Sequence, residues 1–517
     1  MKIYFTGHAG FLIQDKETNI VIDPWFSKKG AFLRSWYQFP KNHHMTDFVI
    51  QKLIEKKNNY VFVTHDHEDH FDAETLTTLS KYCDNLIVPD FKNKSLLNMA
   101  KKLKFKNLKC LGEEENNLIG DLRINIFIQE TAINIDSAIL VTDSDGYRFL
   151  NLNDCKIHDR VDYISEKYKN INILTQQFSG ASMHPVTYDY DSAKYKKITN
   201  RKKLSKMKGV IDNIGTLKPQ VFIPSAGPPV FLRPDLFDLN FKKDSTFSMF
   251  WEFERYFNKN NFYEDTRFLP LEPGGSINST SGFAEKIMKE KTANEFKKIL
   301  ISYKQDFLEY DVKQTLDVSK IKKKLFKDLS DKLEPIKHFS KENFNKKDVF
   351  DIYFTPDNKT FIRVNLLNAT IENVDVIDNT AYYVHFYNPF FINLVLDKHT
   401  TWSSYFLSFM FKNKRIPDKY NVLVESFLIS RSAKEYNASL LEIDSLRKNE
   451  EKIEVIDKKS GVKYRCNRYC PHQGADLKYA IIENGKIVCP RHAWKFDLKN
   501  NGNCTQNNFT IKSKAIH

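Results

Sequence analysis

Two short cysteine–histidine motifs near the C-terminal end constrain this chain more than any other feature of its sequence. The first is Cys470-Pro471-His472, and after sixteen further residues comes Cys489-Pro490-Arg491-His492. Each motif is a tight loop that presents one sulfur atom and one imidazole. From about residue 436 the sequence also changes to short apolar runs separated by turns that contain Gly and Asn. We therefore expect residues 436–517 to form a small all-β domain around a metal centre.

Two thiolates and two imidazoles are the ligand set of a Rieske-type [2Fe–2S] cluster, in which the cysteines hold one iron and the histidines hold the other. The predicted cluster ligands are Cys470, His472, Cys489 and His492. A zinc site is the alternative, but zinc fingers pair Cys-x₂₋₄-Cys with His-x₃₋₅-His. Gly474 and Trp494 also fit the Rieske pattern. Ala475 replaces the loop cysteine of high-potential Rieske proteins, which favours the oxygenase or ferredoxin kind.

The rest of the chain divides into two regions of different texture. Residues 1–284 alternate short apolar runs, such as Ile20-Val21-Ile22 and Tyr60-Val61-Phe62-Val63, with helical stretches. This alternation predicts sheets buried under helices. Residues 285–435 have a helical and aromatic pattern without a chemical motif, so we expect a mixed helical middle region that serves packing. The predicted fold class is therefore α+β, with three domains.

A dense group of metal-binding residue types lies in Thr64-His65-Asp66-His67-Glu68-Asp69-His70, after the apolar run that ends at Val63. A loop at the end of a strand can turn several such side chains into one pocket. This His-x-His-x-Asp-His pattern resembles the metallo-β-lactamase superfamily, which implies an αββα sandwich over residues 1–284. The resemblance further implies that His65 and His67 bind one metal ion, and that Asp69 and His70 bind a second. Asp154 matches the carboxylate that bridges the two ions.

Two ligands of that superfamily's usual set are missing from their expected places. Ala132 stands where a third histidine is expected, and the segment Pro224-Ser225-Ala226-Gly227 lacks the final one. We consider Glu130 and His184 as replacements, and an oxygen ligand at Glu130 would favour iron or manganese over zinc. The alternatives are a solvent-facing Glu130 and a His184 that is held by a backbone hydrogen bond.

Taken together, the two motifs resemble the CMP-N-acetylneuraminate monooxygenase family. Besides the His65–His70 loop, the shared segments are Asp23-Pro24-Trp25-Phe26, Arg34-Ser35-Trp36-Tyr37, Ser179-Gly180-Ala181-Ser182, Pro185-Val186-Thr187 and Pro219-Gln220-Val221-Phe222-Ile223-Pro224-Ser225-Ala226-Gly227. The order of the modules differs, because that family has its Rieske domain first and this chain has the cluster motif last. The two modules must therefore meet in space whatever their order in the chain.

The resemblance implies a Rieske-coupled non-haem iron monooxygenase that hydroxylates an anionic substrate, such as a nucleotide-linked amino sugar of the CMP-N-acetylneuraminate type. Asp69 and Asp154 are then the catalytic carboxylates beside one or two iron ions, with zinc or manganese left open. The implied partners are O₂ and a separate electron donor: an NAD(P)H-dependent reductase, a ferredoxin or a cytochrome b5-like protein.

Two other functions stay open at this point. One is a metal-dependent hydrolase with an accessory redox cluster, and the other is an electron carrier whose hydrolase-like domain is degenerate. A hydrolase activates water with a Lewis acid and needs no electrons, so a redox motif in the same chain favours the oxygenase.

The bulk composition limits the partners further. The net charge is +14 and the basic residues are spread along the chain, which suits an anionic small molecule, and we expect neither nucleic acid nor a membrane as a partner. No uncharged apolar run is long enough to span a bilayer, and no signal peptide is visible. Seven cysteines are too few for a disulfide scaffold, so we expect a reducing cytoplasm with Cys466 and Cys504 as ordinary thiols. The oligomeric state stays open.

Overall fold

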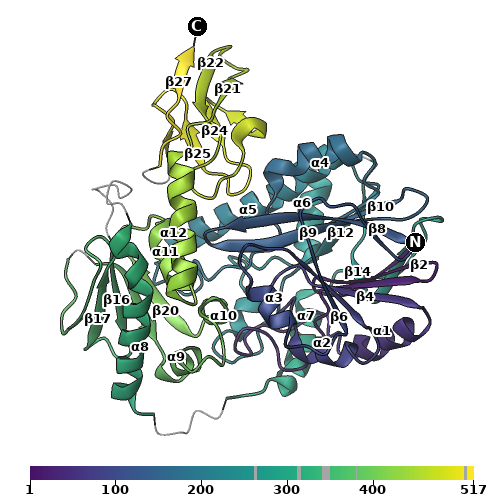
Figure 1. Cartoon of the computed structure of the whole chain (residues 1–517), viewed down its shortest axis with the longest axis horizontal. Coiled ribbons are helices and arrows are strands. Elements are labelled where there is room, and N and C mark those ends of the chain that lie inside the picture. The colour runs from purple at the N-terminus through teal and green to yellow at the C-terminus, as the bar shows by residue number, and fades with distance from the viewer. Residues whose placement is uncertain (261–264, 311–315, 340–349, 380, 506–508, 517) are drawn as a thin grey trace. The chain divides into compact units, whose positions relative to one another are not determined.

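The computed structural model describes residues 1–260, 265–310, 316–339, 350–379, 381–505 and 509–516 (Figure 1). The chain divides into two compact units. The first unit comprises Met1–Glu130, Ile135–Ala181 and Lys196–Glu309, and the second comprises Thr131–Asn134, Ser182–Tyr195 and Tyr310–His517. The three domains expected from the sequence, with boundaries at residues 284 and 435, are a finer division than these two units and remain a prediction.

The first unit contains an eight-stranded sheet with the strand order β15-β14-β1-β2-β3-β4-β5-β6. Its strands are β1 (Lys2–Gly7), β2 (Gly10–Asp15), β3 (Thr18–Ile22), β4 (Asn58–Phe62), β5 (Asn85–Pro89), β6 (Asn107–Leu111), β14 (Leu271–Asn278) and β15 (Ala284–Ile287). Neighbours from β15 to β3 are antiparallel, whereas β3 to β6 are parallel. The parallel part therefore directs the loops after β3, β4 and β5 to one edge of the sheet.

A seven-stranded sheet with the order β13-β12-β11-β10-β9-β8-β7 faces the first. Its strands are β7 (Asn117–Ile119), β8 (Leu122–Thr131), β9 (Asn134–Thr142), β10 (Arg148–Asn153), β11 (Ile173–Gln177), β12 (Val221–Ser225) and β13 (Arg267–Phe268). Strands β10 to β13 run parallel. Their C-terminal ends bring Asn153, Gln177 and Ser225 to one edge of this sheet as well.

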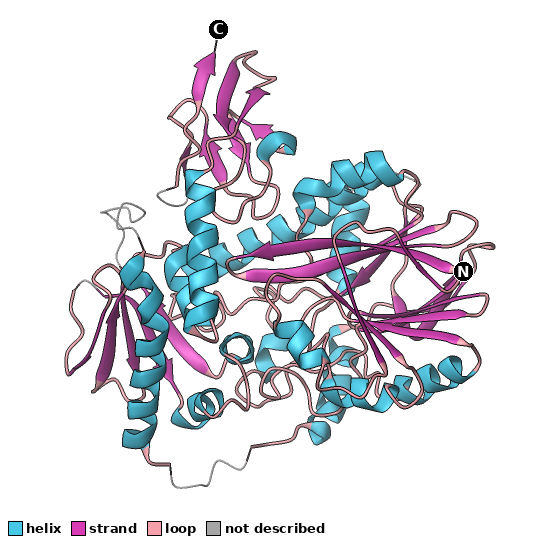
Figure 2. Ribbon diagram, in the orientation of Figure 1, coloured by secondary structure: helices cyan, strands magenta, loops and turns pink. Residues whose placement is uncertain are grey.

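Apolar side chains from both sheets form the core between them, as in the contact of Phe11 with Phe149, whose ring centroids are 5.2 Å apart. Helices cover the outer faces (Figure 2). Side chains of α1 (Met45–Ile54), α2 (Ala73–Leu79) and α3 (Ser95–Ala100) pack on the first sheet. Those of α4 (Val161–Tyr168), α5 (Ser192–Leu217), α6 (Phe250–Asn260) and α7 (Ala293–Tyr303) join the core of the second. The predicted αββα sandwich is thereby confirmed.

In the second unit, the described residues between 316 and 448 form helices and a five-stranded sheet with the order β18-β17-β16-β19-β20. The strands are β16 (Asp351–Thr355), β17 (Phe361–Asn365), β18 (Thr370–Val374), β19 (Ala381–Tyr387) and β20 (Phe411–Arg415), and the helices are α8 (Val318–Leu333), α9 (Pro389–Leu396), α10 (Trp402–Ser408), α11 (Val422–Ile429) and α12 (Ala433–Lys448). The helices were expected, but the sheet was not. Because β16 is buried along its whole length, it lacks the alternation that identifies a strand.

The C-terminal residues form two small antiparallel sheets, as predicted for an all-β domain. One contains β21 (Lys452–Ile456), β22 (Lys463–Asn467) and β27 (Lys514–Ile516), and the other contains β23 (Ile482–Glu483), β24 (Lys486–Val488), β25 (Lys495–Asp497) and β26 (Asn503–Cys504). Their shared core includes Tyr464, Ile487 and Phe496 together with the two predicted ligand cysteines.

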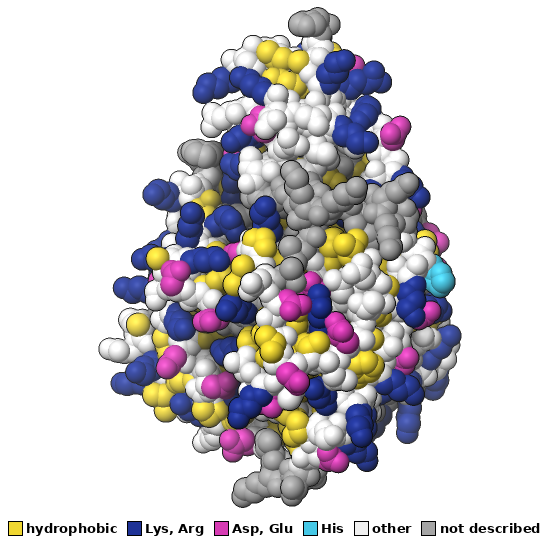
Figure 3. All heavy atoms as spheres, turned by 90° about the vertical axis from the view of Figure 1, so that its left-hand side faces the viewer, with side chains coloured by type: hydrophobic (Ala, Val, Ile, Leu, Met, Phe, Trp, Pro, Cys, Tyr) yellow, Lys and Arg dark blue, Asp and Glu magenta, His cyan; other side chains and the backbone are white. Residues whose placement is uncertain are grey.

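Charge is dispersed over the one face of the molecule that Figure 3 draws. On the face drawn in Figure 3, Lys and Arg side chains are scattered among Asp and Glu and do not gather into one patch. In the part of the chain that the structure describes, no helix combines the length and apolar character needed to cross a bilayer.

Candidate metal centres

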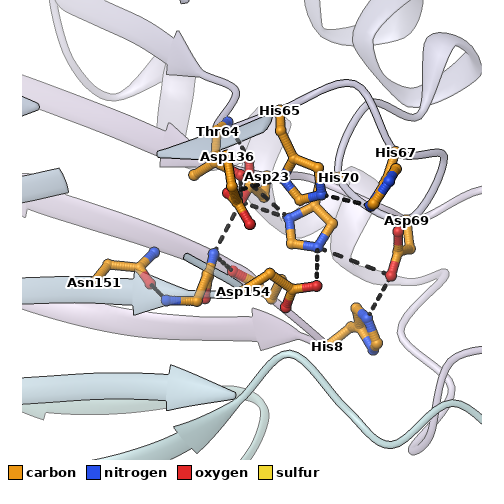
Figure 4. Close-up of polar contacts among 12 residues, drawn as sticks. His8, Asp23, Thr64, His65, His67, Asp69, His70, Asp136, Asn151 and Asp154 are labelled. Atoms are coloured by element: carbon orange, nitrogen blue, oxygen red, sulfur yellow. Dashed lines mark hydrogen bonds and ion pairs between the residues drawn. The ribbon is translucent and has the colours of Figure 1, made fainter. Parts of the chain in front are cut away.

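The loop from His65 to His70 follows β4 and lies at the edge where the parallel strands end. Asp154 follows β10 of the other sheet, so the two sheets converge on one group of side chains (Figure 4). His65 Nε2 lies 2.8 Å from His67 Nδ1. His70 Nε2 lies 3.8 Å from Asp69 Oδ2 and 3.9 Å from Asp154 Oδ2. The predicted ligands of this loop and Asp154 are therefore neighbours.

Two sets of side chains each place one ligand atom apiece within 4.8 Å of the others. One set is His65, His70 and Asp154, and the other is His8, Asp69 and His70. His70 belongs to both sets, so it joins them into a continuous centre. Nearly all of these side chains are buried, and only Asp154 is partly exposed. The chain thus concentrates carboxylates and imidazoles where water has little access.

Carboxylates lie behind two of the imidazoles and orient them. Asp23 Oδ2 lies 2.9 Å from His70 Nδ1, and Asp136 Oδ1 lies 3.3 Å from His65 Nδ1. Asp23 is itself held by the backbone amide and hydroxyl of Thr64 and by Asn153 Nδ2, at 2.7 to 2.9 Å. A carboxylate at Nδ1 fixes the ring and leaves Nε2 to face a metal ion, as is usual around metal-binding histidines.

Electrostatics favour an ionised pair at the heart of this centre. Burial disfavours a charge on His70, but Asp69 and Asp23 overcome this and raise its pKa to about 10. Burial likewise opposes the Asp69 carboxylate, but His70 and His8 lower its pKa well below the usual range. His67 behaves differently, because burial and neighbouring His65 lower its pKa to about 4. His67 is therefore neutral at pH 7 and able to donate a lone pair.

Two buried atoms show that the centre fits a cation. His70 Nε2 and Asp69 Oδ1 have no hydrogen-bond partner among the described residues, although almost all buried polar atoms in proteins have one. Both atoms belong to the converging groups. Imidazole nitrogen and carboxylate oxygen together suit iron, manganese or zinc. The residues present therefore fit the metal ions that the sequence predicts.

Neither set includes Glu130 or His184, and His67 also lies outside both, beside His65. Both carboxylate oxygens of Glu130 accept backbone amides, from Lys92 at 2.8 Å and Asn93 at 2.6 Å, so this side chain holds the loop after β5. His184 belongs to the second unit, where its Nε2 lies 3.1 Å from the Tyr190 hydroxyl and 3.6 Å from Asp418. We therefore do not carry either residue forward as a ligand.

Two residues of the centre were missed at the level of sequence. The motifs in the sequence indicated a role for neither His8 nor Asp136. Asp136 lies four residues after Ala132, near the place of the missing third histidine, but its oxygen contacts His65 on the Nδ1 side. It therefore orients a ligand. The signal for His8 was its position in Gly7-His8-Ala9-Gly10, a turn that presents one imidazole.

The second predicted centre is built from two loops with the same backbone pattern. Cys470 N donates to Ala475 O at 2.9 Å, and Cys489 N donates to Trp494 O at 2.8 Å. In each loop the residue four positions after the cysteine donates back to the cysteine carbonyl. That residue has a left-handed backbone in both, with φ of +67° at Gly474 and +53° at Ala493. The two loops thus curl around their cysteines in the same way.

The side chains of these loops meet. The His472 and His492 ring centroids are 4.7 Å apart, and the Cys470 and Cys489 thiols are linked by a hydrogen bond within the buried core. Burial raises the pKa of Cys470, whereas the Cys470 hydrogen bond lowers that of Cys489. Trp494 stacks on His472 with centroids 3.8 Å apart. The two thiols are thus paired with each other and the two imidazoles with each other, which is how a Rieske-type [2Fe–2S] cluster divides its ligands between its two irons.

Comparison with known families agrees with both centres. Residues 2–155 match the model of the β-lactamase superfamily domain, and residues 434–514 match that of the Rieske [2Fe–2S] domain. This chain carries both domains. The Rieske domain includes all four predicted cluster ligands, and the β-lactamase superfamily domain includes the His65–His70 loop and Asp154.

Two curated relatives, one similar over nearly the whole chain and one over less than half of it, are named as a Rieske protein and as a hydroxylase. A Mycobacterium tuberculosis protein named as a Rieske 2Fe–2S iron–sulfur protein is 25 % identical over 526 residues, which cover 98 % of each chain. The cytidine monophosphate-N-acetylneuraminic acid hydroxylase of Danio rerio is 27 % identical over 235 residues, or 43 % of this chain and 37 % of the hydroxylase. The predicted resemblance to that family is thereby confirmed as a similarity over less than half of the chain.

Among solved structures, CmlA, a diiron β-hydroxylase from Streptomyces venezuelae, is similar over 44 % of each chain with 13 % identity and a TM-score of 0.30. The metallo-β-lactamase fold protein YhfI from Bacillus subtilis is similar over 54 % of this chain and 99 % of its own, with 12 % identity and a TM-score of 0.35. Scores this low carry no argument about function.

Proposed function

We propose that this protein is a Rieske-coupled oxygenase that uses non-haem iron at the His65–His70 centre. The observation that supports it most is the presence, in one chain, of a buried carboxylate–imidazole centre and a Rieske domain. A hydrolytic metal centre has no use for an electron carrier. When loaded, the Rieske domain would supply single electrons and the iron centre would supply O₂ chemistry.

The chain's own residues have distinct roles in this proposal. His65 and His67 would hold one metal ion, Asp69 and His70 would hold the other, and the Asp154 carboxylate would be available as a further ligand. His70 must release the proton that Asp69 and Asp23 stabilise before its Nε2 can bind metal. Asp23 can then remain hydrogen-bonded to Nδ1 and keep the ring in place. Asp69 and Asp154 are the carboxylates next to the reacting atoms.

Cationic side chains near Asp154 support an anionic substrate. Gln177 Nε2 donates to Asp154 Oδ1 at 2.7 Å, and Lys206 Nζ donates to Gln177 Oε1 at 2.7 Å. Burial, and then the charge of nearby Lys156, lowers the pKa of Lys206 to about 7. A bound anion would relieve this repulsion and favour the charged lysine. A nucleotide-linked amino sugar, as the name of the Danio rerio relative suggests, has such a charge.

The proposal requires two partners besides the substrate. Electrons come from a separate NAD(P)H-dependent reductase, a ferredoxin or a cytochrome b5-like donor, and O₂ is the oxidant. Hydroxylation inserts one oxygen atom of O₂ into a C–H bond. The second oxygen atom leaves as water, which takes two electrons from the donor and two protons.

Metal content and oxygen uptake of the full chain test the proposal. We expect about four iron atoms per chain with two metal positions filled, of which two belong to the cluster. Oxygen uptake with CMP-N-acetylneuraminate should need a reductant, and Asp69→Ala with His70→Ala should abolish it while the cluster spectrum stays unchanged. Reductant-independent turnover with zinc in the centre would identify a hydrolase instead. Iron in the cluster alone would identify an electron carrier.

A further inference from the structure

His8 has an unusual backbone for a histidine. It follows β1 in the short turn to β2, with φ of +54°, in the left-handed region that non-glycine residues rarely adopt. Such strained positions cluster at functional sites, where the surrounding structure maintains them. The turn places the ring in the interior, 6 % exposed, with Trp25 packed against its face at a centroid distance of 5.0 Å.

The backbone of His8 adjoins the segment that lacks the expected final histidine. Ala226 N donates to His8 O at 2.8 Å, and Ala226 lies in the loop just after β12. A histidine in this segment would approach the metal centre from the end of β12. The chain has no histidine there, but the hydrogen bond attaches the turn that carries His8 to the same place.

The His8 side chain points into the centre. Its Nε2 lies 3.0 Å from Asp69 Oδ2, and the His8 and His70 ring centroids are 6.2 Å apart. His8, Asp69 and His70 form one of the two sets whose ligand atoms lie within 4.8 Å of one another. We propose that His8 supplies the missing imidazole ligand of the second metal position, beside Asp69 and His70. This inference rests on the proposed function, since it assigns a ligand to the same centre.

With His8, the second metal position would have three protein ligands, Asp69, His70 and His8. The first would have His65 and His67, and a carboxylate oxygen of Asp154 lies within 4.8 Å of ligand atoms of both His65 and His70. Nitrogen and oxygen donors of this kind select a divalent first-row metal such as iron or manganese. The alternative role for His8 is to donate a hydrogen bond from Nε2 to Asp69 and only position that carboxylate. One nitrogen cannot do both, because metal binding requires its lone pair.

Two isosteric substitutions separate these roles. In His8→Gln the amide can still donate a hydrogen bond to Asp69, but it is a weak ligand. In His8→Glu the carboxylate cannot donate when ionised, but it binds metal well. The matched control is His43→Gln, because His43 is a half-buried histidine near the start of the chain whose Nδ1 lies 2.9 Å from the Phe26 carbonyl, outside both ligand sets found among the described residues.

The readout is iron per full-length chain after loading with iron(II), together with the cluster absorption. We expect His8→Gln to lose about one of the two iron atoms beyond the cluster, and His8→Glu and His43→Gln to keep both. Retention of both iron atoms in His8→Gln with loss in His8→Glu would overturn the ligand assignment and make His8 a positioning residue. Equal retention in both variants would overturn it as well.

Failure to fold is also informative. If both variants unfold without metal, refolding in the presence of iron(II) should rescue His8→Glu alone, and rescue of neither would contradict the assignment. Iron binding by the unaltered chain separates failure of the proposed function from failure of the His8 assignment. If it binds no iron beyond the cluster, the proposed function fails together with the role of His8. If it binds two further ions and His8→Gln does too, only the role of His8 fails.

Discussion

The two metal centres of this chain are supported in different ways. In the N-terminal centre, carboxylates lie behind the rings, with Asp23 at His70 and Asp136 at His65. In the Rieske domain, backbone hydrogen bonds shape the loops, and the aromatic rings of Trp494 and Tyr420 pack against His472. Buried carboxylates give the N-terminal centre negative charge that a metal ion would neutralise. The predicted cluster ligands are instead surrounded by apolar and aromatic side chains.

The two centres should therefore respond differently to substitution of their residues. The Rieske ligands come from loops only a few residues long, so the loss of one thiol removes the site. The candidate ligands of the N-terminal centre come from the loop after β4 and from the ends of β1 and β10, so orientation by a neighbour matters almost as much as the ligand itself. The four predictions below test this contrast, beginning with the largest effect.

Replacing Cys489 by serine should abolish the [2Fe–2S] cluster, because one iron loses a thiolate that no other loop residue replaces. The visible absorption of the cluster should disappear from the full-length chain. Iron at the N-terminal centre should remain. Cys83→Ser is the control, since Cys83 is a buried thiol in the core under the first sheet and should leave the absorption intact. A normal spectrum in Cys489→Ser would remove this residue from the ligand set.

Replacing Asp23 by asparagine should weaken metal binding at the N-terminal centre by about 10- to 100-fold, the usual cost of losing a carboxylate behind a histidine ligand. Titration of the metal-free centre with cobalt(II) would measure this. The cluster absorption should not change. Asp121→Asn is the control, because that carboxylate bonds Thr18 Oγ1 at 3.0 Å, away from the ligands. Equal affinities for the two variants would reduce Asp23 to a structural role.

The charge on His70 should make the stability of the metal-free protein depend on pH. Its pKa is raised in the folded state, so its contribution to stability is complete below the ordinary value of about 6.5 and is lost as pH rises through about 10. Between pH 7 and 10, the urea midpoint of the unaltered protein should therefore approach that of His70→Gln. A constant difference between the two proteins, measured with a chelator present, would show that the imidazole is neutral.

The smallest effect concerns Cys466, a buried thiol in the same core as the cluster ligands, whose pKa burial raises to about 11. A thiol held neutral in this way is a packing group. Cys466→Ala should lower the free energy of unfolding by about 1 kcal/mol and leave the cluster potential unchanged. A shift in the cluster potential would mean that the Cys466 sulfur acts on the cluster as well as packing in the core.

Local patterns predicted the parts of both centres that local structure determines. The Cys–His loops and the His65–His70 loop are short, so their spacing alone indicated which side chains converge. The role of His8 depends on β1 pairing with β14 and on Ala226 reaching the first turn, and neither contact is visible in sequence. Glu130 was chosen for its residue type, but the amides of Lys92 and Asn93 occupy it. The five-stranded sheet was missed because its central strand β16 is short and wholly buried, and such a strand resembles part of a buried helix.

The pairing of β1 with β14 means that the first strand of the sheet cannot be fully paired until most of the first unit has been translated. A ribosome that has released residue 154 has already delivered every N-terminal ligand named here, from His8 to Asp154. The strand that holds the far side of β1, in the register Lys2 with Asn278, has not yet been translated at that moment. The loop that carries Ala226, which fastens the turn at His8, also comes later. We therefore expect this centre to bind metal late in synthesis or after it, once the sandwich has closed on its first strand.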